Sequence, residues 1–111
     1  MELTKQLDGS RHRQSVAKNQ RLGQGVNPIA TVMLGGVNYL TGEVMDMPAI
    51  TAATHGIGAT MGWDLAHAAG NIPLQLHEWG VDFGAWCTYK YLNSGPGAVA
   101  GAFVHERHLG E

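Results

Sequence analysis

Hydrophobic residues in this chain occur in short runs separated by glycine, proline and polar turn residues. The first run, residues 29–34, stops at a pair of glycines. Such a short, continuous apolar run is typical of a strand buried on both faces of a parallel sheet. Three later runs, at 59–63, 81–87 and 98–104, have the same character. We therefore predict four short strands.

The segments between these runs follow a different pattern. Pro48 opens a stretch of small and apolar residues, 49–59, which predicts a helix with proline in its first turn. Two glycines inside this stretch weaken the expected C-terminal end of the helix. Residues 65–70 read as a turn, and residues 74–79 favour a brief helical segment or another turn. Strands alternating with such segments predict an α/β fold.

Charge separates a polar leader from the apolar remainder of the chain. Residues 1–28 hold five of the seven Lys and Arg, whereas the later residues hold two basic side chains and seven carboxylates. A nucleic-acid-binding surface is favoured by basic residues together with aromatic ones, and the leader has no aromatic residue. We therefore expect residues 1–28 to be a solvated, poorly ordered leader, with no nucleic-acid partner.

Length and cysteine content exclude several classes of protein. The 111 residues suffice for one small domain and are too few for a two-domain enzyme. The sequence has no run of 18 apolar residues, which excludes a transmembrane helix, and no apolar core that would predict a secretory signal. The single cysteine, Cys87, fits a reducing, cytoplasmic compartment. We interpret its side chain as a small buried apolar group rather than a reactive thiol.

Two charged residues follow predicted strands. Asp64 comes directly after the run 59–63, and Lys90 closely follows the run 81–87. Ligands of open α/β sheets bind outside the carboxyl ends of strands. A lysine and a carboxylate there would suit an aldehyde cofactor, because the lysine forms a Schiff base and the carboxylate keeps a pyridinium nitrogen protonated. On spacing alone, a surface lysine and a turn or capping aspartate remain the commoner explanation.

Several motifs resemble those of the kynureninase family in order and spacing. They are MLGGVNYLTG at 33–42, DLAHA at 64–68, LHEWGVDF at 76–83, WCTYKYLNSG at 86–95 and AGAFVH at 100–105. The segment around Lys90 is far more specific than an isolated glycine-rich loop. Residues 1–28 contain no motif that we can match to this family.

The resemblance implies a fold and a set of site residues. Residues 29–111 are expected to form part of the large domain of a fold-type I pyridoxal-phosphate enzyme, an α/β domain with short, mostly buried strands. Lys90 is then the lysine that forms the Schiff base and moves protons, and Asp64 is the partner of the pyridinium nitrogen. His67 and Tyr89 are implied to contact the cofactor, with Tyr89 near its phosphate, although such residues are often only packing groups.

The other histidines after the leader are expected to have structural or solvent-facing roles. They are His55, His77, His105 and His108. No HExxH motif and no paired cysteines suggest zinc, so we predict no metal site.

The family reaction is the hydrolytic cleavage of the Cβ–Cγ bond of kynurenine or 3-hydroxykynurenine, giving alanine and an anthranilate in tryptophan catabolism and NAD biosynthesis. Family members are several times longer, have a second smaller domain and are homodimers. We therefore expect this chain alone to have little or no activity. Two alternatives stay open: a non-catalytic fragment that pairs with a full-length subunit, and another fold-type I enzyme such as a cysteine desulfurase or an aminotransferase relative.

Overall fold

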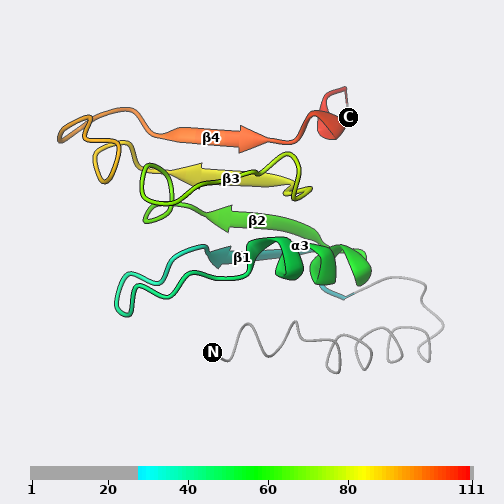
Figure 1. Ribbon diagram of the computed structural model, residues 1–111. Coiled ribbons are helices and arrows are strands. Elements are labelled where there is room, and N and C mark those ends of the chain that lie inside the picture. Colours follow the sequence, from blue (N-terminus) through cyan, green and yellow to red (C-terminus); the bar gives the residue numbers. More distant parts are fainter. Residues whose placement is uncertain (1–27, 111) are drawn as a thin grey trace.

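The computed structural model describes residues 28–110 (Figure 1). The elements are β1 (Thr31–Gly35), α3 (Met47–Gly56), β2 (Thr60–Asp64), β3 (Phe83–Trp86), β4 (Gly101–Val104) and the 3-10 helix η1 (Glu106–His108). The four strands form one sheet in the order β1-β2-β3-β4. Residues 1–27 of the leader lie outside this range. The expectation that the leader is poorly ordered therefore stays a prediction.

Three of the strands are parallel. β1, β2 and β3 run in the same direction, and β4 runs antiparallel to β3. The carboxyl ends of the three parallel strands therefore meet at one edge of the sheet, on the left in Figure 1. Asp64 lies in the middle of this edge, because it pairs in register with Gly35 of β1 and with Ala85 of β3.

One face of the sheet is packed against α3 and the β2–β3 connection. Met61 and Trp63 of β2 are completely buried there, in a cluster with Met47 of α3 and Leu65 of the connection. Burying a large apolar side chain contributes about 1.5–3 kcal/mol, so each of these side chains stabilises the packing of α3 on the sheet. Because Trp63 directly precedes Asp64, this packing also holds the carboxyl end of β2 in place.

The opposite face is open in the described part of the chain. Met33, Gly62, Phe83 and Val104 are register neighbours across the four strands and so share this face. Met33 is 53% exposed and Val104 is 58% exposed. The expectation that the first strand is buried on both faces is therefore wrong: its residues alternate between exposed and half-buried. The reason is that α3 and the β2–β3 connection cover only one side of the sheet.

The helix lies close to its predicted position. α3 begins at Met47 and ends at Gly56, so it starts and ends earlier than the stretch 49–59 predicted. Pro48 is in its first turn, as expected, and Asp46 caps the helix by accepting a hydrogen bond of 3.2 Å from a first-turn N–H. The helix cannot continue to residue 59 because Gly58 adopts a φ of +79° and turns the chain towards β2.

The remaining predicted elements are confirmed with shorter bounds. The strands predicted from 59, 81 and 98 begin at Thr60, Phe83 and Gly101. Residues 65–70 form a turn as expected, and residues 74–79 contain turns and no helix. In the described residues, no helix is long and apolar enough to cross a membrane.

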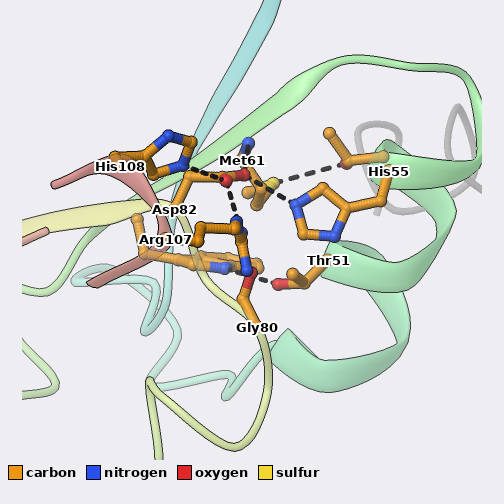
Figure 2. Close-up of polar contacts among 9 residues, drawn as sticks. Thr51, His55, Met61, Gly80, Asp82, Arg107 and His108 are labelled. Carbon is orange, nitrogen blue, oxygen red and sulfur yellow. Dashed lines mark hydrogen bonds and ion pairs between the residues drawn. The ribbon is translucent and has the colours of Figure 1, made fainter. Parts of the chain in front are cut away.

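Figure 2 shows the polar contacts of Asp82 at the amino-terminal edge of the sheet. The residue is 4% exposed. One carboxylate oxygen accepts hydrogen bonds from His55 Nε2 at 2.6 Å and from the Met61 N–H at 2.7 Å. The other accepts from His108 Nε2 at 2.8 Å and from the Arg107 guanidinium. Burial raises the pKa of Asp82, but these hydrogen bonds outweigh it and hold the pKa far below its ordinary value. The carboxylate thus ties α3, β2 and the C-terminal η1 segment together.

Candidate functional site

Three of the four candidate residues come together at the carboxyl edge of the parallel strands. Asp64 ends β2, and its side chain is exposed on the open face of the sheet. Its register neighbours, Gly35 and Ala85, have minimal side chains, so the space beside the carboxylate is free of bulky groups. One carboxylate oxygen accepts a hydrogen bond of 2.9 Å from the Ala66 N–H. This bond fixes the orientation of the carboxylate at the strand end.

Two cavities meet at Asp64, which lines both of them. The first, about 250 Å³, is lined by Leu34, Gly35, Val37, Asn38, Tyr39, Leu40, Met45, Asp64 and His67. The second, about 420 Å³, is lined by Met33, Asp64, Ala66, Ala85, Trp86, Cys87, Lys90 and Ala100. His67 therefore faces one cavity and Lys90 the other, with the carboxylate between them.

Lys90 and His67 contact each other across this boundary. The Nζ atom of Lys90 lies 3.4 Å from Nε2 of His67. An ammonium group can only donate hydrogen bonds, so a charged Lys90 requires Nε2 to be the acceptor and Nδ1 to carry the imidazole proton. The contact brings a primary amine and an imidazole to the edge at which Asp64 presents its carboxylate.

The loop that carries Lys90 is closed by its own hydrogen bonds. The Thr88 hydroxyl donates to the carbonyl of Val99 at 2.6 Å, and the Ser94 N–H donates to the carbonyl of Thr88 at 3.1 Å. Asn93 has a φ of 57°, which agrees with the turn chemistry expected here. The start of the loop is thereby fixed relative to the strand that follows it.

Tyr89 lies beside Lys90 but outside the group formed by Asp64 and His67. Its ring centroid is 5.7 Å from Lys90 Nζ, and the residue is 51% exposed. It is not among the residues that line either of the two cavities. Cys87, by contrast, is half-buried and lines the second cavity, so the expectation of a small buried apolar residue is wrong. Its position directly after β3 places it at the open carboxyl edge instead of in the core.

Two tyrosines that the sequence reasoning left without a role flank His67. The Tyr39 ring stacks on the imidazole with centroids 6.0 Å apart and an interplanar angle of 29°. The Tyr91 ring meets it edge-on at 5.9 Å and 69°. Both follow strand ends at the edge where His67 lies, and that shared placement is the signal that could have identified them.

The remaining described histidines lie away from this edge. His55 and His108 bind Asp82, and His77 donates a 2.9 Å hydrogen bond to Glu106 while stacking on His105 at 4.6 Å. The bond to Glu106 raises the pKa of His77 above its ordinary value and lowers that of Glu106. These contacts agree with the expected structural and solvent-facing roles. Among residues 28–110, no cluster of three or more His, Cys, Asp or Glu could hold a metal ion.

A lysine, a carboxylate and an imidazole at the carboxyl edge of a parallel α/β sheet are groups that a pyridoxal-phosphate site can use. Residues 11–110 match the class-V aminotransferase family. The chain belongs to this family, whose members depend on pyridoxal phosphate. The match begins at residue 11, within the leader for which the motifs offered no counterpart.

Curated relatives place the chain near the kynureninases. It is 71% identical over 83 residues to the kynureninase of Salinispora tropica, which covers 75% of this chain and 19% of that protein. It is 60% identical over 93 residues to the kynureninase of Flavobacterium johnsoniae, covering 84% and 21%. The resemblance found in the motifs is thereby confirmed. The chain spans about a fifth of the length of these relatives.

A solved structure confirms the fold. The alanine–glyoxylate aminotransferase of Nostoc sp. superposes with a TM-score of 0.65 at 23% sequence identity, over 81% of this chain and 24% of that one. Together with the family match, this superposition shows that the α/β sheet described above has the fold of fold-type I pyridoxal-phosphate enzymes, as expected.

Proposed function

We propose that this chain supplies the cofactor-lysine part of a kynureninase, an enzyme that hydrolyses the Cβ–Cγ bond of L-kynurenine or 3-hydroxykynurenine to L-alanine and an anthranilate. The observation that carries the proposal is the meeting of Lys90, His67 and Asp64 at one sheet edge, in a chain 71% identical over 83 residues to a kynureninase. The whole enzyme would act as a cytoplasmic homodimer on small molecules of the kynurenine class.

The residues at this edge fit pyridoxal phosphate. Lys90 offers the primary amine that an aldehyde needs, and Asp64 offers a carboxylate for the pyridine nitrogen. Gly35 and Ala85, on either side of Asp64, leave the open face free for a flat ring. When bound, the cofactor supplies an electron sink that makes the proton on the substrate α-carbon removable.

The chain's own groups then have distinct tasks. Lys90 carries protons at Nζ, which requires a neutral amine at the moment of proton removal. His67 contacts the cofactor and accepts a hydrogen bond from Lys90 at Nε2, so it restricts where the amine can point. Tyr89, whose ring lies beside Nζ, would donate a hydrogen bond from its hydroxyl group to the cofactor phosphate. Asp64 keeps a negative charge at the strand end.

The open sheet face favours a second candidate. Met33 and Val104 are each more than half exposed on a sheet of a type that is normally covered on both faces. A chain with such a face suits a non-catalytic subunit that pairs with a longer member of the same family. Co-expression with a full-length kynureninase and purification through a tag on the short chain tests this candidate. Recovery of the short chain alone would exclude it.

The main test is covalent labelling by the cofactor. The purified chain is mixed with pyridoxal phosphate, its visible absorption spectrum is recorded, and the adduct is reduced with borohydride and mapped by peptide mass spectrometry. We expect the label on Lys90, with the band lost in Lys90→Ala and kept in Lys18→Ala. Equal labelling of Lys5, Lys18 and Lys90 would refute a cofactor site in this chain. We also expect no turnover of kynurenine by the chain alone.

A further inference from the structure

The imidazole of His67 is held between aromatic rings from two different loops. Tyr39 belongs to the β1–α3 loop and stacks on one side, and Tyr91 belongs to the β3–β4 loop and meets the ring edge-on. His67 itself lies in the β2–β3 connection. Three connections that follow three parallel strands therefore converge on one imidazole, whose Nε2 lies 3.4 Å from Lys90 Nζ.

The turn that presents Tyr39 is closed by hydrogen bonds. The Asn38 side chain accepts from the Leu40 N–H at 2.9 Å, and the Asn38 carbonyl accepts from the Gly42 N–H at 2.8 Å. A bridge between Val37 and Val44 joins the two ends of the turn. Tyr39 is nevertheless 72% exposed, so burial in the core does not account for its position. The aromatic contact that its ring makes is the one with His67.

Tyr91 lies where two segments of backbone approach each other closely. A Cβ atom on Gly70 would lie 3.0 Å from the carbonyl carbon and oxygen of Tyr91, which shows how closely the two segments approach. The Tyr91 side chain is 44% exposed, so it too is held in place without deep burial. Both rings thus present exposed aromatic surface to the same imidazole, Tyr39 from a hydrogen-bonded turn and Tyr91 from a segment that lies close to Gly70.

We propose that Tyr39 and Tyr91 are positioning residues that hold His67 with Nε2 directed at Lys90, so that the amine of Lys90 is presented at the cavity edge beside Asp64. Aromatic pairs of this kind contribute about 0.5–1.5 kcal/mol each, enough to restrain the imidazole against rotation out of the plane in which Nε2 reaches Lys90. Without the rings, the imidazole is free to turn and Lys90 loses its acceptor. The proposal rests on the proposed function, since it concerns the amine assigned there to the cofactor.

The first measurement is nitrogen NMR of His67 at about pH 8, where an ordinary imidazole is neutral. We expect a single tautomer in the unmodified chain, with the proton on Nδ1 and Nε2 as acceptor. The double variant Tyr39→Ala/Tyr91→Ala should show tautomer-averaged signals, and the matched Tyr39→Phe/Tyr91→Phe variant should keep the single tautomer. Leu40→Ala controls for damage to the Tyr39 turn, because Leu40 is 77% exposed and lines the same cavity.

The second measurement is the rate at which pyridoxal phosphate labels Lys90, with Lys18 as an internal reference in the same chain. We expect the double alanine variant to label Lys90 about tenfold more slowly, and the phenylalanine variant at the original rate. An unchanged tautomer in the alanine variant, in chains whose circular dichroism is native, overturns the proposal. If the tautomer responds as expected but Lys90 is never labelled selectively, the positioning of His67 is supported and the proposed function fails.

Discussion

The indole Nε1 of Trp63 donates a hydrogen bond of 3.0 Å to the hydroxyl of Thr51. Trp63 and Thr51 are both completely buried, so this bond joins β2 to α3 inside the core. Asp64 is the next residue after Trp63. The hydrogen bond therefore connects the packing of the helix to the strand end at which the candidate site begins.

Replacing Thr51 by valine keeps the shape of the side chain but removes the acceptor for the Trp63 indole. A buried donor without a partner costs about 1–3 kcal/mol, so we expect the free energy of unfolding to fall by about 2 kcal/mol. Urea denaturation measures the loss. Thr54→Val is the matched control, because Thr54 is equally buried but donates only to the sulfur of Met61. Equal losses in the two variants would contradict this account of the bond.

Asp82→Asn should destabilise the fold far more than a surface substitution does. The asparagine amide would direct N–H groups at the donors of His55, Arg107 or His108, so we expect a loss of about 3 kcal/mol at neutral pH. Denaturant unfolding checks the value. Asp46→Asn is the control, since asparagine caps a helix about as well as aspartate and should change stability by less than about 0.5 kcal/mol.

The same carboxylate gives stability a defined dependence on pH. The pKa of Asp82 is lower in the folded protein than in the unfolded chain. Its contribution to the free energy of unfolding is therefore complete above the unfolded value, about pH 4, and is lost as the pH falls from there through the folded value. The stability difference between the original chain and Asp82→Asn should shrink over this acidic range. A difference that stays constant below pH 4 would refute the linkage.

Gly70→Ala should disturb the loop that carries Lys90. Gly70 and Gly58 have φ values of +80° and +79°, so alanine at either position costs about 1 kcal/mol of backbone strain. Only the new Cβ at Gly70 would press on the backbone of Tyr91, whereas nothing lies within 4 Å at Gly58. We expect slower pyridoxal-phosphate labelling of Lys90 in Gly70→Ala and an unchanged rate in Gly58→Ala. Peptide mass spectrometry after borohydride reduction measures both, and equal rates would count against the contact.

The reactivity of Cys87 provides an independent test of cofactor binding in the cavity that contains Lys90. Cys87 and Lys90 line it together, so a cofactor attached to Lys90 should hinder access to the thiol. We expect alkylation of Cys87 by iodoacetamide to slow several-fold after addition of pyridoxal phosphate. The Lys90→Ala variant should show no such protection. Protection that persists in this variant would mean that the cofactor binds elsewhere or without the lysine.

The strands could be predicted from local sequence, whereas the site residues were assigned through the resemblance to the kynureninase family. Short apolar runs bounded by glycine and polar residues marked the strands, and Asp64 and Lys90 stood directly at or shortly after their ends. These features depend on neighbouring residues alone. Hence the α/β class followed from the pattern of short apolar runs, and the assignment of Asp64 and Lys90 to a site required the family motifs as well.

The remaining features depend on contacts between distant residues. The four hydrogen bonds to Asp82 join positions 21 to 27 residues apart, and no local pattern records such pairings. The open face went unpredicted because the run 29–34 reads the same whether one side of the sheet is covered or both. The direction of β4 was likewise undetermined, since a short apolar strand pairs in either orientation.

The parallel pairing of β2 with β3 also sets when the site can appear during folding. A parallel pair cannot be closed by a tight hairpin, so residues 65–82 must first cross over the sheet face. His67 lies within this crossover, while Asp64 and Lys90 lie before and after it. Closing such a connection is an intrinsically slow, non-local step. A chain emerging from the ribosome therefore cannot present its lysine and carboxylate together until β3 has docked, so the proposed cofactor site can form only at a late stage of folding.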